Sequence, residues 1–95
     1  MHKIVQNLIE IENKIKLISD THNINYLPKI IAVSKTFKIE KILPLIQYGH
    51  INFGENKVQE AEDKWAKIKL TYPNVKLHMI GKLQKNKVKS AVKLF

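Results

Sequence analysis

Apolar residues at the start of the chain recur at the spacing of an α-helix. They fall four or three residues apart, at Ile4, Leu8, Ile11, Ile15 and Ile18. Side chains at this spacing share one face of a helix. The pattern predicts a helix from Ile4 to about Ser19, ended by the polar segment 20–23, and then a loop through Pro28.

A run of four apolar residues, 30–33, follows this loop and ends at Ser34 and Lys35. A short apolar run of this kind predicts a fully buried strand of a parallel sheet. The C-terminal ends of such strands carry the ligand crevice. Lys35 is therefore a candidate imine-forming amine, because desolvation favours the neutral, nucleophilic form. The alternative is a lysine whose ammonium simply reaches into water.

Helical and strand patterns alternate along the rest of the chain. We expect helices over Ile39–Tyr48, Val58–Ile68 and Val88–Phe95, and strands over 50–56 and Val75–Ile80. Gly49 suits a helix end, whereas Pro44 must kink its helix or delay its start. The order, one helix and then strand–helix three times, predicts an α/β fold with parallel strands and right-handed crossovers.

Composition narrows the class of protein. The 95 residues suffice for one small domain, and 44% hydrophobic with 26% charged residues is typical of a globular chain. We expect neither a signal peptide nor a membrane helix. The net charge of +9 allows nucleic-acid binding. However, all 17 basic residues are lysines, whereas bidentate phosphate and base contacts favour arginine.

The candidate chemistry lies at the predicted strand ends. Phosphate-binding glycine motifs are absent from the sequence, the four histidines are too scattered to predict a metal site, and Ser34, His78 and Asp63 lack the local motif of a catalytic triad. In a barrel the strand ends converge on one mouth, which would bring together Lys35, Glu55, Asn56 and His78.

Each of these positions also has a structural interpretation. Asn56 would serve equally well as a turn or helix-capping residue, and His78 as a satisfied core histidine. The carboxylates of 60–63 lie on a helix with many lysines, and Glu60–Lys64 and Asp63–Lys67 are spaced as supportive pairs on a solvated face. The lysine-rich segment 82–87 could contact an anion but is typical of a solvated run.

Three blocks in register resemble one protein family. Residues 31–36 read IAVSKT, 53–60 read FGENKVQE, and 78–87 read HMIGKLQKNK. Together they resemble the pyridoxal-phosphate homeostasis protein family, whose domain is a barrel similar to the N-terminal domain of alanine racemase. The resemblance implies a partial TIM-type (β/α) barrel, with residues 1–95 as a single incomplete domain, the N-terminal portion of a (β/α)8 barrel.

The resemblance also implies a function. Lys35 matches the family's Schiff-base lysine for pyridoxal 5′-phosphate (PLP), and Asn56 and His78 match positions on the cofactor side of the barrel. It implies a cytoplasmic cofactor carrier or regulator without established turnover. A barrel of this type needs roughly 200 residues or more, and its phosphate-binding loops come late in the chain. We therefore expect weakened binding and, as an alternative, an interaction fragment that needs a complementing chain or self-associates through unpaired strand edges.

Overall fold

The computed structural model describes residues 2–23, 25 and 28–95. The chain forms two units, residues 1–30 and 31–95, and each is described by itself. The first unit contains helix α1 (Lys3–Thr21), two residues longer at its C-terminal end than its apolar spacing predicts. The His2 side chain caps it by accepting a hydrogen bond from the Ile4 N–H at 3.3 Å. Among the described residues, no helix is long and apolar enough to cross a membrane.

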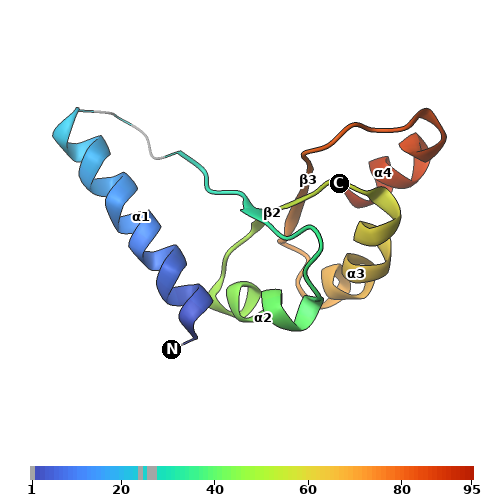
Figure 1. The fold of residues 1–95 in the computed structure, drawn as a ribbon, viewed down its shortest axis with the longest axis horizontal. Helices are drawn as coiled ribbons and strands as arrows, with labels where there is room; N and C mark the ends of the chain where they lie inside the picture. The colour runs from blue at the N-terminus through green and yellow to red at the C-terminus, as the bar shows by residue number, and fades with distance from the viewer. Residues whose placement is uncertain (1, 24, 26–27) are drawn as a thin grey trace. The chain divides into compact units, whose positions relative to one another are not determined.

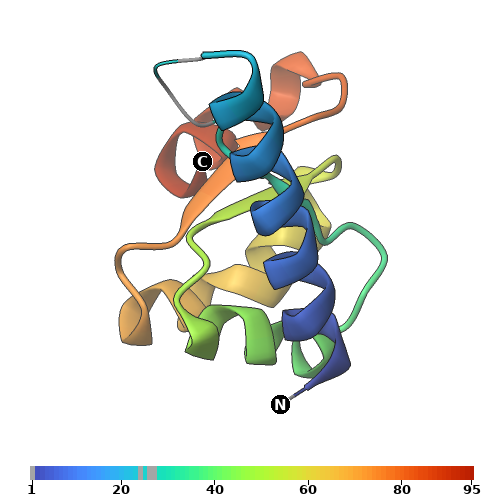
Figure 2. The same cartoon turned by 90° about the vertical axis from the view of Figure 1, so that its left-hand side faces the viewer.

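The second unit alternates strands and helices as expected (Figure 1). Its elements are β1 (Ala32–Val33), α2 (Ile39–Tyr48), β2 (Asn52–Glu55), α3 (Val58–Thr71), β3 (Lys76–Met79), a 3₁₀ turn (Lys85–Lys87) and α4 (Val88–Leu94). The strands form one parallel sheet in the order β1-β2-β3. Figure 2 shows β2 and β3 side by side and running in the same direction. The predicted α/β class with three parallel βα units is confirmed.

Helix α2 begins at Ile39 although it contains Pro44. Of the two expected effects of this proline, a delayed start is therefore wrong. The helix ends as predicted at Gly49, whose φ of 111° is a left-handed backbone conformation that favours glycine.

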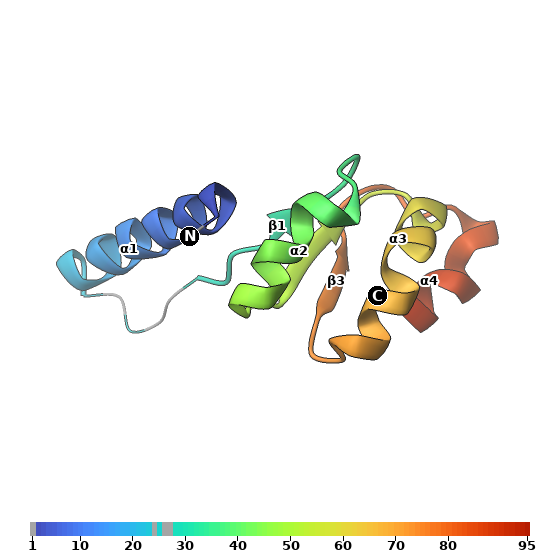
Figure 3. The same cartoon turned by 90° about the horizontal axis from the view of Figure 1, so that it is seen from below.

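The core lies between the sheet and its helices. Phe53 of β2 and Trp65 of α3 are both fully buried, with ring centroids 4.9 Å apart. Leu77 of β3 is paired in register with Phe53 and shares the same face of the sheet. Helix α3 contacts α4 (Figure 3). Near the C-terminal end of α3, the Lys69 ammonium donates to the Leu94 carbonyl at 2.8 Å. The helices therefore cover one face of the sheet.

The other face of the sheet explains why one expectation for β1 is wrong. The strand was predicted to be fully buried, but Ile31 is 40% and Val33 51% exposed, and Ile80 beyond β3 is 43% exposed. Side chains alternate between the two faces of a strand, so these residues lie opposite the helices. We call this side the inner face, because it corresponds to the interior of a closed barrel.

Candidate functional site

Strand register places His78 on the inner face, and Lys35 and Asn56 lie just beyond the ends of β1 and β2. Gly54 pairs with Val33 on one side and with His78 on the other. The ladders continue past the strands, because the Ser34 N–H donates to the Gly54 carbonyl and the Ile80 N–H to the Glu55 carbonyl, each at 3.0 Å. Asn56 directly follows β2, and Lys35 lies two residues beyond β1, so both lie at the C-terminal end of the sheet.

Two glycines allow close approach around these positions. A Cβ at Gly54 would lie 3.1–3.2 Å from the side chains of Ile80 and Ile31. A Cβ at Gly81 would lie 2.8 Å from the Asn56 Cβ and 3.1 Å from the Asn56 carbonyl oxygen. Gly81 thereby lets the chain leaving β3 pack against the end of β2, where Asn56 lies.

The three residues differ in exposure and in partners. Lys35 is exposed, so the expectation that its amine is desolvated is wrong, and the alternative of a lysine that reaches into water fits. Asn56 and His78 are half-buried. A ring nitrogen of His78, Nε2, lies 2.9 Å from the Asn52 Oδ1, so this histidine has a polar partner on the inner face. It points away from the side of Leu77, as its place between two apolar residues predicts. Asn56 does not cap α3, because the N-cap is Lys57; the capping interpretation is wrong.

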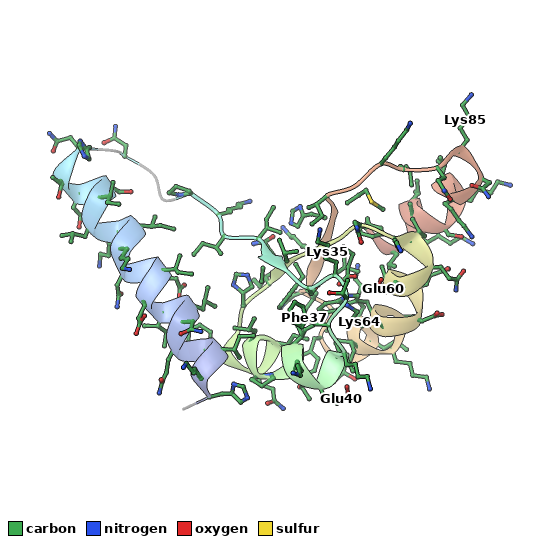
Figure 4. All side chains as sticks on the ribbon, viewed as in Figure 1. Lys35, Phe37, Glu40, Glu60, Lys64 and Lys85 are labelled. Atoms are coloured by element: carbon green, nitrogen blue, oxygen red, sulfur yellow. The ribbon has the colours of Figure 1, made fainter. Side chains whose placement is uncertain are left out.

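A cavity of about 400 Å³ lies at the ends of β2 and β3. Its lining includes Asn56 and three lysines, Lys57, Lys82 and Lys87. Among the described residues, the lining contains these three lysines and no acidic side chain, so the cavity is positively charged. Lys85 of the same lysine-rich segment projects well away from Lys35 (Figure 4). Lys82 and Lys87 of this segment therefore line the cavity, whereas Lys85 does not.

Glu55 does not join this site. It is fully buried on the helix side of the sheet, where its Oε2 accepts hydrogen bonds from the Ser34 hydroxyl, the Lys64 ammonium at 2.9 Å and the Trp65 indole N–H at 3.2 Å. Its Oε1 has no hydrogen-bond partner among the described residues. The expectation that Glu55 shares one mouth with the other candidate residues is wrong. Adjacent residues of a strand point to opposite faces of the sheet, so Glu55 points away from the inner face.

A β-turn carries Lys35 out of β1. The Phe37 N–H donates to the Ser34 carbonyl at 3.2 Å, with Lys35 and Thr36 in the central positions. Lys64 of α3 also donates to the Ser34 carbonyl, at 2.6 Å, and the Thr36 N–H donates to Glu60 of α3 at 2.7 Å. Figure 4 labels Lys35, Glu60 and Lys64 around this turn.

These contacts revise the expectations for α3. The expected Glu60–Lys64 ion pair forms, with 3.6 Å between Nζ and Oε1. Glu60 also accepts a hydrogen bond from the turn, so it is not merely part of a solvated helix face. Asp63 accepts a hydrogen bond from Gln59 at 3.1 Å. Ser34 and His78 lie on opposite faces of the sheet, so they cannot act together in a triad. Among the described residues, no group of three His, Cys, Asp or Glu side chains could hold a metal ion.

Parallel strands alternating with helices, and a lysine at the end of the first strand, define part of an α/β-barrel protein. No family model matches the chain. It is 38% identical to a pyridoxal phosphate homeostasis protein of Buchnera aphidicola (subsp. Baizongia pistaciae) over all of this chain and 41% of that protein. The homologue of Haemophilus influenzae, bearing the same name, is 39% identical over 97% of this chain and 39% of that protein.

The solved structures agree with these matches. PipY of Synechococcus elongatus, in a structure described as without PLP, is 36% identical and superposes with a TM-score of 0.65 over 85% of this chain and 38% of that chain. PipY has also been solved with PLP bound. The chain is thus a relative of the pyridoxal phosphate homeostasis proteins and matches the N-terminal part of their barrel. It spans about two fifths of the length of these relatives.

The buried Glu55–Lys64 pair yields a stability prediction. The side chains are 0% and 8% exposed. Lys64→Met leaves a buried carboxylate without its cation, and removing one partner of such a pair costs about 3–5 kcal/mol in free energy of unfolding. Adding Glu55→Gln removes the unpaired charge while keeping an acceptor for Ser34 and Trp65. We expect the double variant to be more stable than Lys64→Met alone, as measured by urea unfolding.

The contradicting result is a double variant whose loss equals the sum of the two single losses. Strict additivity would show that the two groups do not interact. The matched control is Lys67→Met, which removes an exposed lysine from the same helix.

Proposed function

We propose that this chain binds PLP and serves vitamin B6 homeostasis, with the cofactor held as a Schiff base on Lys35. The observation that carries the proposal is the position of Lys35 beyond the C-terminal end of β1, at the same end of the sheet as Asn56 and His78. This is the end of parallel strands at which barrel proteins bind ligands. The relatives bear the name pyridoxal phosphate homeostasis protein, and PipY has been solved with PLP bound.

The residues present fit the cofactor's two reactive features. PLP would supply an aldehyde, and the exposed amine of Lys35 would hold it through a C=N bond, with water as the leaving group. The lysines around the cavity at the ends of β2 and β3 would attract the phosphate dianion. Asn56 borders this cavity, and His78 lies at the same end of the sheet as Lys35. We therefore assign Lys35, Asn56 and His78 as cofactor-binding residues.

We also propose that residues 1–95 correspond to the N-terminal portion of a single (β/α)8 domain, acting in the cytoplasm as a cofactor carrier rather than an enzyme. In such barrels the phosphate is held by loops after the seventh and eighth strands. The described residues of this chain form three strands. Each charge-assisted hydrogen bond that those loops supply is worth roughly 1.5–3 kcal/mol, so the chain alone should bind PLP weaker by several powers of ten.

Titration with PLP tests this proposal. We expect the saturable Schiff-base absorbance of the 95-residue chain to half-saturate well above micromolar PLP. Lys35→Ala should abolish the saturable part of the absorbance. The other lysines have no shaped site for PLP, so their reaction with it should not saturate. Lys38→Ala is the matched control and should leave it intact, since Lys38 is an exposed lysine three residues away.

Equal absorbance in Lys35→Ala and the unaltered chain would contradict the assignment of the amine. Half-saturation at micromolar PLP would contradict only the expected weakness, because it would show that three strands suffice to hold the phosphate.

The exposed apolar side chains of the inner face favour a second function, which is association with another chain. This face exposes Ile31, Val33 and Ile80, and β1 and β3 are the edges of the sheet among the described residues. Exposed apolar surface next to unpaired strand edges favours association. Because the chain spans about two fifths of its relatives, we propose that the partner is a polypeptide supplying the remaining strands of the barrel.

Mixing tests the second function. The C-terminal three fifths of the Buchnera relative, produced as a separate chain, should co-elute with this chain in size-exclusion chromatography and raise its Schiff-base absorbance. Separate elution, or a homodimer of this chain that excludes the added polypeptide, would contradict the proposed partner.

A further inference from the structure

Both peptide groups that flank the Lys35 α-carbon are bound by side chains of α3. The carbonyl of the Ser34–Lys35 peptide accepts a hydrogen bond from Lys64 Nζ at 2.6 Å. The N–H of the Lys35–Thr36 peptide donates to Glu60 Oε1 at 2.7 Å. Glu60 and Lys64 are four residues apart on α3, and their charged atoms lie 3.6 Å apart. Two neighbouring side chains thus hold the backbone on either side of Lys35.

The turn needs this support because of Thr36. Its φ is 67°, in the left-handed region that is uncommon for a β-branched residue. The third position of a turn with this geometry is usually glycine or asparagine. A threonine held there is strained, and such strain persists only where the surrounding structure fixes the conformation. The contact of Glu60 with the Thr36 N–H supplies part of that restraint.

The ammonium of Lys64 is well suited to hold the turn. Its side chain is 8% exposed, its Nζ donates to the Ser34 carbonyl and to Glu55 Oε2, and it forms an ion pair with Glu60 Oε1. Glu55 is fully buried in β2, so Lys64 ties the turn to the buried core. Lys35 itself is exposed, and its direction therefore depends on the backbone that carries it.

We infer that Glu60 and Lys64 are positioning residues for the Lys35 amine, which they aim at the inner face by clamping both of its peptide groups from α3. The inference rests on the proposed function, since it assumes that Lys35 is the amine that reacts. The two residues touch neither the amine nor the cofactor. They act through the backbone, so their loss should redirect Lys35 without removing it.

The first measurement uses the chain without cofactor. Amide hydrogen exchange at Thr36, followed by NMR, reports directly on the hydrogen bond to Glu60. Glu60→Ala should speed this exchange roughly tenfold, which corresponds to the loss of one hydrogen bond. Glu60→Gln keeps an acceptor oxygen and should retain most of the protection. Glu62→Ala is the matched control, because it removes a carboxylate on another side of the same helix.

The second measurement maps the amine that reacts with PLP. The chain is incubated with PLP and treated with borohydride, which adds hydride to the C=N carbon and makes the link permanent. Peptide mass spectrometry then gives the share of label on Lys35 among the 17 lysines. Glu60→Ala should lower that share several-fold, and Glu60→Gln should restore it. The label on the other lysines should not change, so the total should fall only by the amount that Lys35 loses.

The double variant Lys64→Met with Glu55→Gln tests the other half of the clamp without leaving an unpaired buried charge. It should lower the share of label on Lys35 as Glu60→Ala does. If this variant does not fold, the two Glu60 variants decide the question. A mere loss of stability would not reproduce the difference between Glu60→Ala and Glu60→Gln in the share of label.

The outcomes separate the two proposals. Even labelling of all lysines in the unaltered chain would overturn the proposed function, and the positioning role with it. An excess of label on Lys35 that survives Glu60→Ala unchanged would overturn the positioning role alone. Unchanged hydrogen exchange at Thr36 in Glu60→Ala would overturn it as well.

Discussion

The buried carboxylate of Glu55 is the constraint on which this arrangement depends. A charge that is fully removed from water is tolerated only where a counter-charge and hydrogen bonds replace the lost hydration. Glu55 obtains them from Ser34 at the end of β1 and from Lys64 and Trp65 of α3. One side chain of β2 therefore requires the first strand end and the third helix to meet. The turn that carries Lys35 is fixed as a consequence.

The two faces of the sheet carry different residues: the helix face contains the core, and the inner face belongs to the proposed cofactor site. On the helix face, Phe53, Trp65 and Leu77 form the core, and the Glu55 network joins them. On the inner face lies His78, and Lys35 and Asn56 follow the ends of β1 and β2. The buried Ser34 side chain binds Glu55 on the helix face, while the exposed Lys35 lies in the turn that follows.

The order of elements could be predicted from the sequence because the apolar spacing changes between strands and helices. The exposure of Val33 could not, because four consecutive apolar residues indicate a strand without showing how much of each face is covered. The contact of Glu60 with the turn after β1 could not be predicted from the sequence either. Its spacing to Lys64 predicts an ion pair, but only the tertiary structure brings the Thr36 N–H to it. The glutamate after Phe53 and Gly54 in an apolar strand was the one signal of a buried network.

The central claim is that one face of this sheet, centred on Lys35, receives PLP. NMR chemical-shift mapping of the 95-residue chain with added PLP tests it most directly, because it reports on every residue at once and tolerates weak binding. The account predicts the largest changes at Lys35, Asn56 and His78, with Trp65 and Leu77 on the opposite face little affected. Changes confined to the lysine-rich segment 82–87, with the Lys35 signals unmoved, would contradict it.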